Sequence, residues 1–141
     1  MNMFFKKNEN ENKDVIEDLI DICALLIHAA KIDENYSEKE LEIIKKTLLL
    51  MGAKINDLNE IIQKGEIIEK NSNQILNFTK KIKKMNEEDK IKIIEALWQI
   101  IYSNDDADVY ETNLMRRLAG LLYIDNKTMG DIKEKIKNKK S

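Results

Sequence analysis

Two short acidic stretches hold the residues of this sequence that are best suited to chemistry. Each follows a long apolar segment and precedes a second, shorter one. Carboxylate and amide oxygens on short loops are the ligands that Ca²⁺ and Mg²⁺ prefer. The candidate ligands of such a cation are Asp33, Asn35 and Glu40 in the first stretch and Asn104, Asp106, Asp108 and Glu111 in the second.

A second interpretation of the same residues is purely structural. Ser37 and Glu40 are three positions apart, as are Asp108 and Glu111, and this is the spacing of a helix capping box. Carboxylates at the start of a helix also gain about 0.3–1 kcal/mol from its dipole. Each stretch is therefore a helix cap, a cation site or both, and the cofactor is either Ca²⁺ or Mg²⁺ or none.

The single histidine and the single cysteine suggest no catalytic centre. Cys23 falls among apolar residues and is predicted to be a buried, inert thiol. His28 is predicted to be a half-buried structural residue, because one histidine cannot build a zinc site without further nitrogen or sulfur ligands. The chain also lacks a glycine-rich phosphate loop and a nucleophile elbow. We therefore expect that it is not an enzyme.

The elements that must position these residues are helices. Apolar residues make up 43% of the 141-residue chain and recur at spacings of three and four, while proline is absent and glycine occurs four times. The first helix is predicted from Lys13 to Ile32, after a flexible tail over residues 1–12. The sequence predicts an all-α fold, with one compact domain of about seven helices over residues 13–138. The other helices are expected near residues 37–51, 55–70, 73–85, 87–103, 108–122 and 125–138.

An internal repeat becomes visible when the chain is shifted by 71 residues. Ser37 then falls on Asp108 and Glu40 falls on Glu111, so that each half contains a long apolar helix, an acidic turn and a capped helix. Neither half can bury its wide apolar face alone. We expect the halves to pair with pseudo-two-fold symmetry, which would bring the two acidic stretches together.

This ordered pattern resembles the TerB family of helical domains, which are associated with tellurite resistance. The first copy of the family's turn is similar to residues 30–40. The second is the closer match, through Glu95–Trp98, Asp108–Glu111 and Leu114–Ala119. The similarity extends over about Val15 to Ile132, which is nearly the whole chain.

The resemblance implies a non-enzymatic stress-response module of the tellurite-resistance type, with a divalent cation held by the two acidic turns. The alternative is a metal-free adaptor that binds another protein, similar to the N-terminal domain of DjlA-type co-chaperones. Such co-chaperones carry a His-Pro-Asp motif in a J domain, and a proline-free chain cannot contain it. For the adaptor, Met51, Met115 and Met129 are expected to contribute to an exposed apolar patch.

Location and partners follow from the remaining composition. The N-terminus has no apolar core of signal-peptide length, and the most apolar stretch, Leu19–Ala30, is too short to span a membrane. A cytoplasmic protein is expected. The basic clusters at residues 80–84 and 133–140 lack stacking aromatics and are interpreted as solvated helix faces, not as nucleic-acid sites. A protein partner is expected, and a homodimer is compatible with the sequence.

Overall fold

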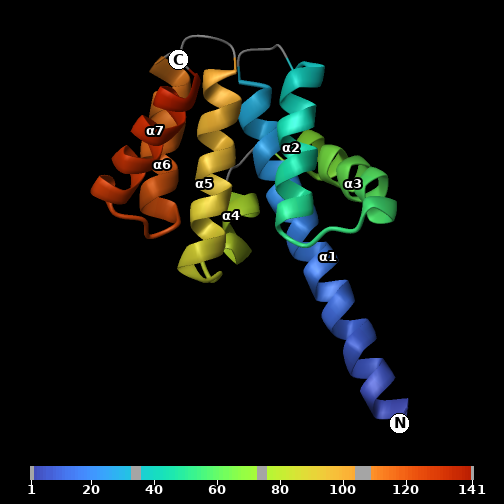
Figure 1. Cartoon of the computed structure of the whole chain (residues 1–141). Coiled ribbons are helices and arrows are strands. Elements are labelled where there is room, and N and C mark those ends of the chain that lie inside the picture. The colour runs from blue at the N-terminus through green and yellow to red at the C-terminus, as the bar shows by residue number, and fades with distance from the viewer. Residues whose placement is uncertain (1, 33–35, 73–75, 104–108, 141) are drawn as a thin grey trace.

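The structure is a computed structural model. It describes the backbone of residues 2–32, 36–72, 76–103 and 109–140 and the side chains of residues 15–32, 36–72, 77–103 and 112–139. Its described part contains seven α-helices and one 3₁₀ segment (Figure 1). They are α1 (Asn2–Ala30), α2 (Glu38–Leu50), η1 (Ile55–Asp57), α3 (Leu58–Asn71), α4 (Leu76–Ile82), α5 (Glu87–Tyr102), α6 (Val109–Leu121) and α7 (Asn126–Lys140).

The prediction of an all-α fold is confirmed, with differences at several helix ends. α1 begins at Asn2 and not near Lys13, because no glycine or proline interrupts the chain between residues 2 and 30. α4 is shorter than the predicted segment 73–85, and the helix expected from Ile55 starts with the 3₁₀ segment η1. Helix ends depend on local caps, which periodicity does not detect.

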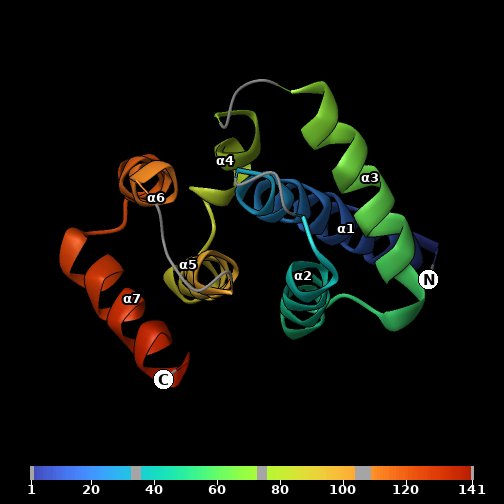
Figure 2. The same cartoon turned by 90° about the horizontal axis from the view of Figure 1, so that it is seen from above.

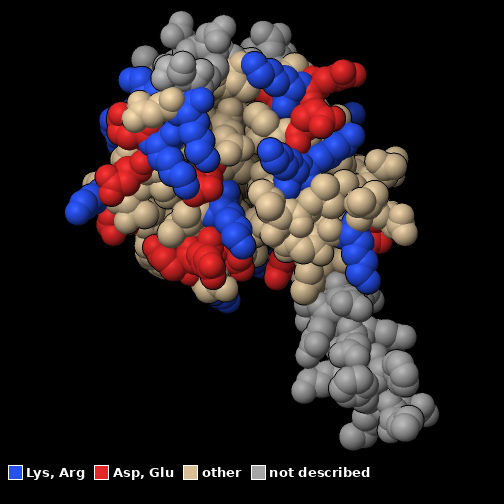
Figure 3. Space-filling model, viewed as in Figure 1, with Lys and Arg blue, Asp and Glu red and all other residues tan. Residues whose placement is uncertain are grey.

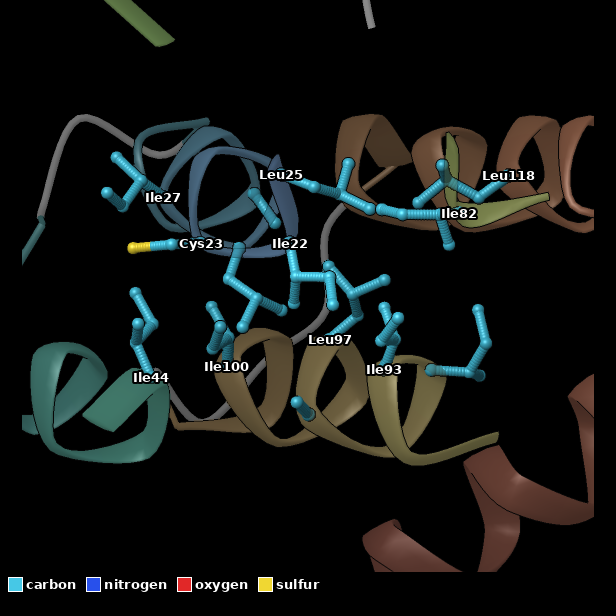
Figure 4. Packing of buried hydrophobic residues seen from close by; sticks show 14 of the residues in the cluster. Ile22, Cys23, Leu25, Ile27, Ile44, Ile82, Ile93, Leu97, Ile100 and Leu118 are labelled. Carbon is cyan, nitrogen blue, oxygen red and sulfur yellow. The ribbon is translucent and has the colours of Figure 1, made fainter. Parts of the chain in front are cut away.

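Helix α1 is the centre of the bundle. It packs against α2, α3, α4 and α5, while α5 also packs against α2 and α7 (Figure 2). Its residues Ile22, Cys23, Leu25 and Ile27 are almost fully buried and point in several directions (Figure 4). The wide apolar arc of this segment is therefore explained by neighbours on most sides of the helix.

A glycine permits the close crossing of α1 and α3. A Cβ atom placed on Gly65 would lie 2.9 Å from Cys23 Sγ and 3.0 Å from Cys23 Cβ. Real side chains essentially never approach so closely, so a larger residue would force the helices apart. The glycine that weakens the helical pattern of this segment is thus required by tertiary packing.

Helix α2 ends in a glycine turn, as the sequence predicts. Gly52 has φ +106°, and the Ala53 amide donates a 2.9 Å hydrogen bond to the Leu48 carbonyl. Only glycine adopts this backbone region without strain.

Helix α6 ends with the same hydrogen-bond pattern but with Tyr123 in the left-handed position, at φ +57°. The Ile124 amide donates to the Ala119 carbonyl at 2.9 Å. Buried Lys90 of α5 donates from Nζ to the Leu122 carbonyl at 2.9 Å, and this bond to a helix C-terminus offsets part of the backbone strain. The two turns are 71 positions apart, like the predicted repeat, although the pseudo-two-fold symmetry itself stays a prediction.

Candidate functional site

The start of α2 holds the one predicted cation ligand whose side chain is described. Glu40 is fully buried, and its Oε1 accepts hydrogen bonds from the Ser37 amide at 3.4 Å and from Ser37 Oγ at 3.1 Å. The Glu40 amide donates in turn to Ser37 Oγ at 3.5 Å. This reciprocal pair is a capping box, so the structural interpretation of these two residues is confirmed.

The other six predicted ligands lie outside the part of the chain that can be described in full. Asp33, Asn35, Asn104, Asp106 and Asp108 are outside the described residues, and Glu111 is described only as backbone of α6. Their proposed role in metal binding is therefore still a prediction. Among the side chains that are described, no three His, Cys, Asp or Glu residues gather in a way that could hold a metal ion.

The helix ends that flank both acidic stretches lie at the same end of the bundle. The C-terminal ends of α1 and α5 and the N-terminal ends of α2 and α6 are all at this end, although α2 and α6 lie on opposite sides of α5 (Figures 1 and 2). A side-chain contact joins the two regions, because Lys39 Nζ in the first turn of α2 donates to the Ser103 carbonyl at 3.3 Å. Ser103 is the residue that follows α5.

A polar cluster beside Glu40 was not anticipated from the sequence. The Tyr36 hydroxyl is buried and has no hydrogen-bond partner among the described atoms. Burial raises the pKa of Tyr36, and the charge of Glu66 on α3 raises it further, followed by smaller effects of Cys23 and Glu40. The hydroxyl therefore stays protonated at physiological pH. A tyrosine inside the first acidic stretch gave no distinct signal in the sequence.

Cys23 and His28 behave as structural residues. Burial, with a smaller effect of the Glu66 charge, raises the pKa of Cys23 to about 12, so that the thiol is not a nucleophile at neutral pH. The half-buried ring of His28 lies 5.9 Å from that of Phe78, centroid to centroid, in a tilted arrangement. Burial lowers the pKa of His28, a shift that Glu69 opposes and Arg117 reinforces.

The buried aromatic pair of α5 also belongs to the core. Trp98 is 2% exposed, and its ring stacks on that of Tyr102 at 5.8 Å. Lys133 of α7 lies over the indole with Nζ 5.4 Å from the ring centroid. Met115 and Met129 are buried as well, so the expectation that they form an exposed apolar patch is wrong. Both belong to the buried hydrophobic core instead.

An open groove with an apolar lining lies between α2 and α7, with α5 as its floor. Figure 2 shows α5 between these two helices. One hollow of about 260 Å³ is lined by Lys39, Ile43, Gln99, Tyr102, Ile136 and Lys139, together with Ser103. We call this hollow and its continuation along α2 the α2–α5–α7 groove.

The continuation of the groove runs toward the C-terminal end of α2. It has a volume of about 680 Å³ and shares Ile43 and Gln99 with the first hollow. Its further lining includes Lys45, Lys46 and Leu49, and Leu49 is 40% exposed. From the sequence alone, the basic cluster at residues 133–140 is interpreted as a solvated helix face. The groove is not predicted, because only the tertiary structure places α7 opposite α2.

The fold and these sites define a class of protein: a small all-α domain in which four helices, α2 to α5, pack around a long central helix and α7 packs on the outer side of α5. Within the described residues, every helix is too short or too polar to cross a lipid bilayer. A sequence model of the family described as tellurite resistance protein TerB matches residues 19–134. The chain therefore belongs to the TerB family. Comparison with curated proteins gave no match, and comparison with solved structures gave none either.

Proposed function

We propose that this chain is a non-enzymatic, TerB-like stress-response module of the cytoplasm that acts by binding another protein. The α2–α5–α7 groove is the observation that carries this proposal. It combines an apolar lining with a polar rim, which is the usual composition of a protein-binding surface. The protonated thiol of Cys23 and the packed imidazole of His28 support the non-enzymatic part.

Site-specific photocrosslinking in the native cell tests this proposal. A photoreactive phenylalanine analogue at exposed Gln99, on the groove floor, is expected to give a discrete crosslinked protein. The same analogue at exposed Asn59 of α3, which does not line the groove, is the matched control. Equal crosslinking at both positions, or none at Gln99, would contradict protein binding in the groove.

Binding of a divalent cation by the acidic turns is the second candidate. The common location of the flanking helix ends, together with the bond between Lys39 and Ser103, favours it. Binding of Ca²⁺ or Mg²⁺ to the folded state alone would raise the melting temperature, and the increase would grow as the cation concentration rises above the dissociation constant. An increase that is lost on replacing Asp33 and Asp106 by Asn would support the cation. An unchanged melting temperature in millimolar cation would argue against it.

A further inference from the structure

The rim of the α2–α5–α7 groove carries an unbalanced positive charge. Among the described residues, its charged lining consists of four lysines, Lys39, Lys45, Lys46 and Lys139, and one carboxylate, Glu42. None of these lysines forms an ion pair with another described residue, whereas Lys81 on a different face is paired with Asp21 at 3.3 Å. Figure 3 shows lysine and arginine side chains on both sides of an uncharged band on this face.

The interior of the groove is apolar. Ile43 and Leu49 of α2 and Ile136 of α7 contribute to its lining, and Tyr102 covers part of α5. Leu49 is 40% exposed and Ile43 is partly exposed, whereas Ile136 is 5% exposed, so the apolar area that a partner could bury lies chiefly on α2. Each Å² of apolar surface removed from water contributes about 25 cal/mol. The occupant must therefore offer apolar side chains as well as negative charge.

The positions of these residues on α2 indicate the shape of the occupant. Lys39, Ile43 and Lys46 follow one another at spacings of four and three, so they form one stripe along the helix. Leu49 continues the lining three positions beyond Lys46. This stretch of α2 is about 15 Å long at 1.5 Å per residue, which a partner helix of about three turns would match.

From this charge, apolar lining and spacing, we infer that the groove binds an acidic amphipathic helix of a partner protein. Apolar residues on one face of that helix would contact Ile43, Leu49 and Ile136, and carboxylates at its edges would pair with the rim lysines. The inference rests on the proposed protein-binding function and adds the chemical class of the partner.

The groove suits other anionic partners less well. Nucleic-acid binding without a base-reading motif uses exposed aromatic side chains as stacking platforms, and the one aromatic among the described lining residues, Tyr102, is only 9% exposed. A membrane surface contacts protruding apolar residues, whereas this apolar lining lies in a hollow between helices.

Fluorescence anisotropy with designed peptides tests the inference on the full chain. The probe is a labelled helical peptide of about 15 residues with leucines on one face and glutamates at both edges. The comparison peptide carries lysine at every glutamate position. We expect the acidic peptide to bind at least about tenfold more tightly, with an affinity that falls as salt screens the charges.

Charge-reversal variants locate the binding and sharpen its cause. Lys39→Glu/Lys46→Glu should weaken binding of the acidic peptide by about tenfold or more and should restore binding of the lysine peptide. Lys80→Glu/Lys84→Glu changes the net charge equally on the α4 side of the molecule and should change the affinity less than about twofold. Melting curves of both variants confirm that they are folded.

Three results would overturn the inference. The first is equal affinity of the chain for both peptides. The second is an equal loss of affinity for the acidic peptide in both charge-reversal variants. The third is binding of anionic vesicles or single-stranded RNA through Lys39 and Lys46 when the acidic peptide does not bind. A groove-specific crosslink in the cell that persists in Lys39→Glu/Lys46→Glu would reject the acidic partner and leave the protein-binding function standing. Absence of the Gln99 crosslink in the chain without the charge reversals would reject both the acidic partner and the protein-binding function.

Discussion

Two regions of the molecule differ in how closely their helices pack. Helices α1 and α3 cross in close contact, whereas the α2–α5–α7 groove stays open. At the first, Gly65 lets α3 approach until a single added methyl group would collide with Cys23. At the second, α2 and α7 stay far enough apart to leave two connected hollows, and the lysines at their rim form no ion pair with another described residue. The difference indicates that the α1–α3 interface contributes to stability, whereas the side chains of the groove remain accessible to a partner.

The largest effect is expected at the closed interface. Gly65→Ala places a Cβ atom 2.9 Å from Cys23 Sγ and should lower the free energy of unfolding by about 1–3 kcal/mol, because both helices must shift. Urea unfolding measures this change. Gly120→Ala is the matched control in α6, where nothing lies within 4 Å of the added atom, and it should stabilise by about 0.5–1 kcal/mol. Equal effects of both variants would contradict the close crossing.

A stabilising substitution is expected near the same interface. The Tyr36 hydroxyl is buried without a partner among the described atoms, and such a group costs about 1–3 kcal/mol. Tyr36→Phe removes the hydroxyl and keeps the ring, so it should raise the free energy of unfolding by about 1 kcal/mol. Thermal unfolding provides the measurement. A lower free energy of unfolding in Tyr36→Phe would mean that the hydroxyl makes a hydrogen bond in the folded chain, which would contradict this prediction.

The open groove should respond in binding and hardly in stability. Leu49→Asp places a charge on a side chain that is 40% exposed, and the free energy of unfolding should change by no more than about 0.5 kcal/mol. Binding of the acidic peptide should be lost, because the new carboxylate repels it and removes an apolar contact. Ile67→Asp on α3, where the wild-type residue is 59% exposed, is the control and should leave binding intact. A large stability loss at Leu49 would place this residue in the core.

The smallest expected effect is a pH dependence of stability caused by His28 of α1. Burial lowers the pKa of His28 in the folded state, so the unfolded chain binds more protons between that pKa and the ordinary value of 6.5. His28 should therefore reduce stability as the pH falls below about 6.5. Urea unfolding at pH 7 and pH 5.5 compares the chain with His28→Gln, whose stability should fall less. An equal fall in both would exclude His28 as the cause.

Sequence periodicity predicted the helices well because burial repeats every three to four residues along a helix. Ser37 and Gly52 also indicated the helix ends that they form. The left-handed turn at Tyr123 was not predictable, because its stabilising contact with Lys90 joins residues far apart in the chain.

The candidate sites were less predictable than the helices. The capping box of Ser37 and Glu40 was one of two interpretations of a local spacing, and only coordinates show the hydrogen bonds. The groove has no local signal at all. Lys39 and Lys139 line one hollow although 100 positions separate them, and only the packing of α2 and α7 on α5 brings them together.

Mapping the acidic peptide by NMR is the most direct test of the claim that this TerB-family chain binds an acidic helix through its open face. Amide shifts would be recorded on the ¹⁵N-labelled full chain during titration with the peptide. We predict perturbations along Lys39–Leu49 of α2, around Gln99 of α5 and near Ile136 of α7. None is expected along α3 beyond its first turn, where Leu58 lines the groove. Perturbations centred on α3 or on the lysines of α4, or none at saturating peptide, would contradict the account.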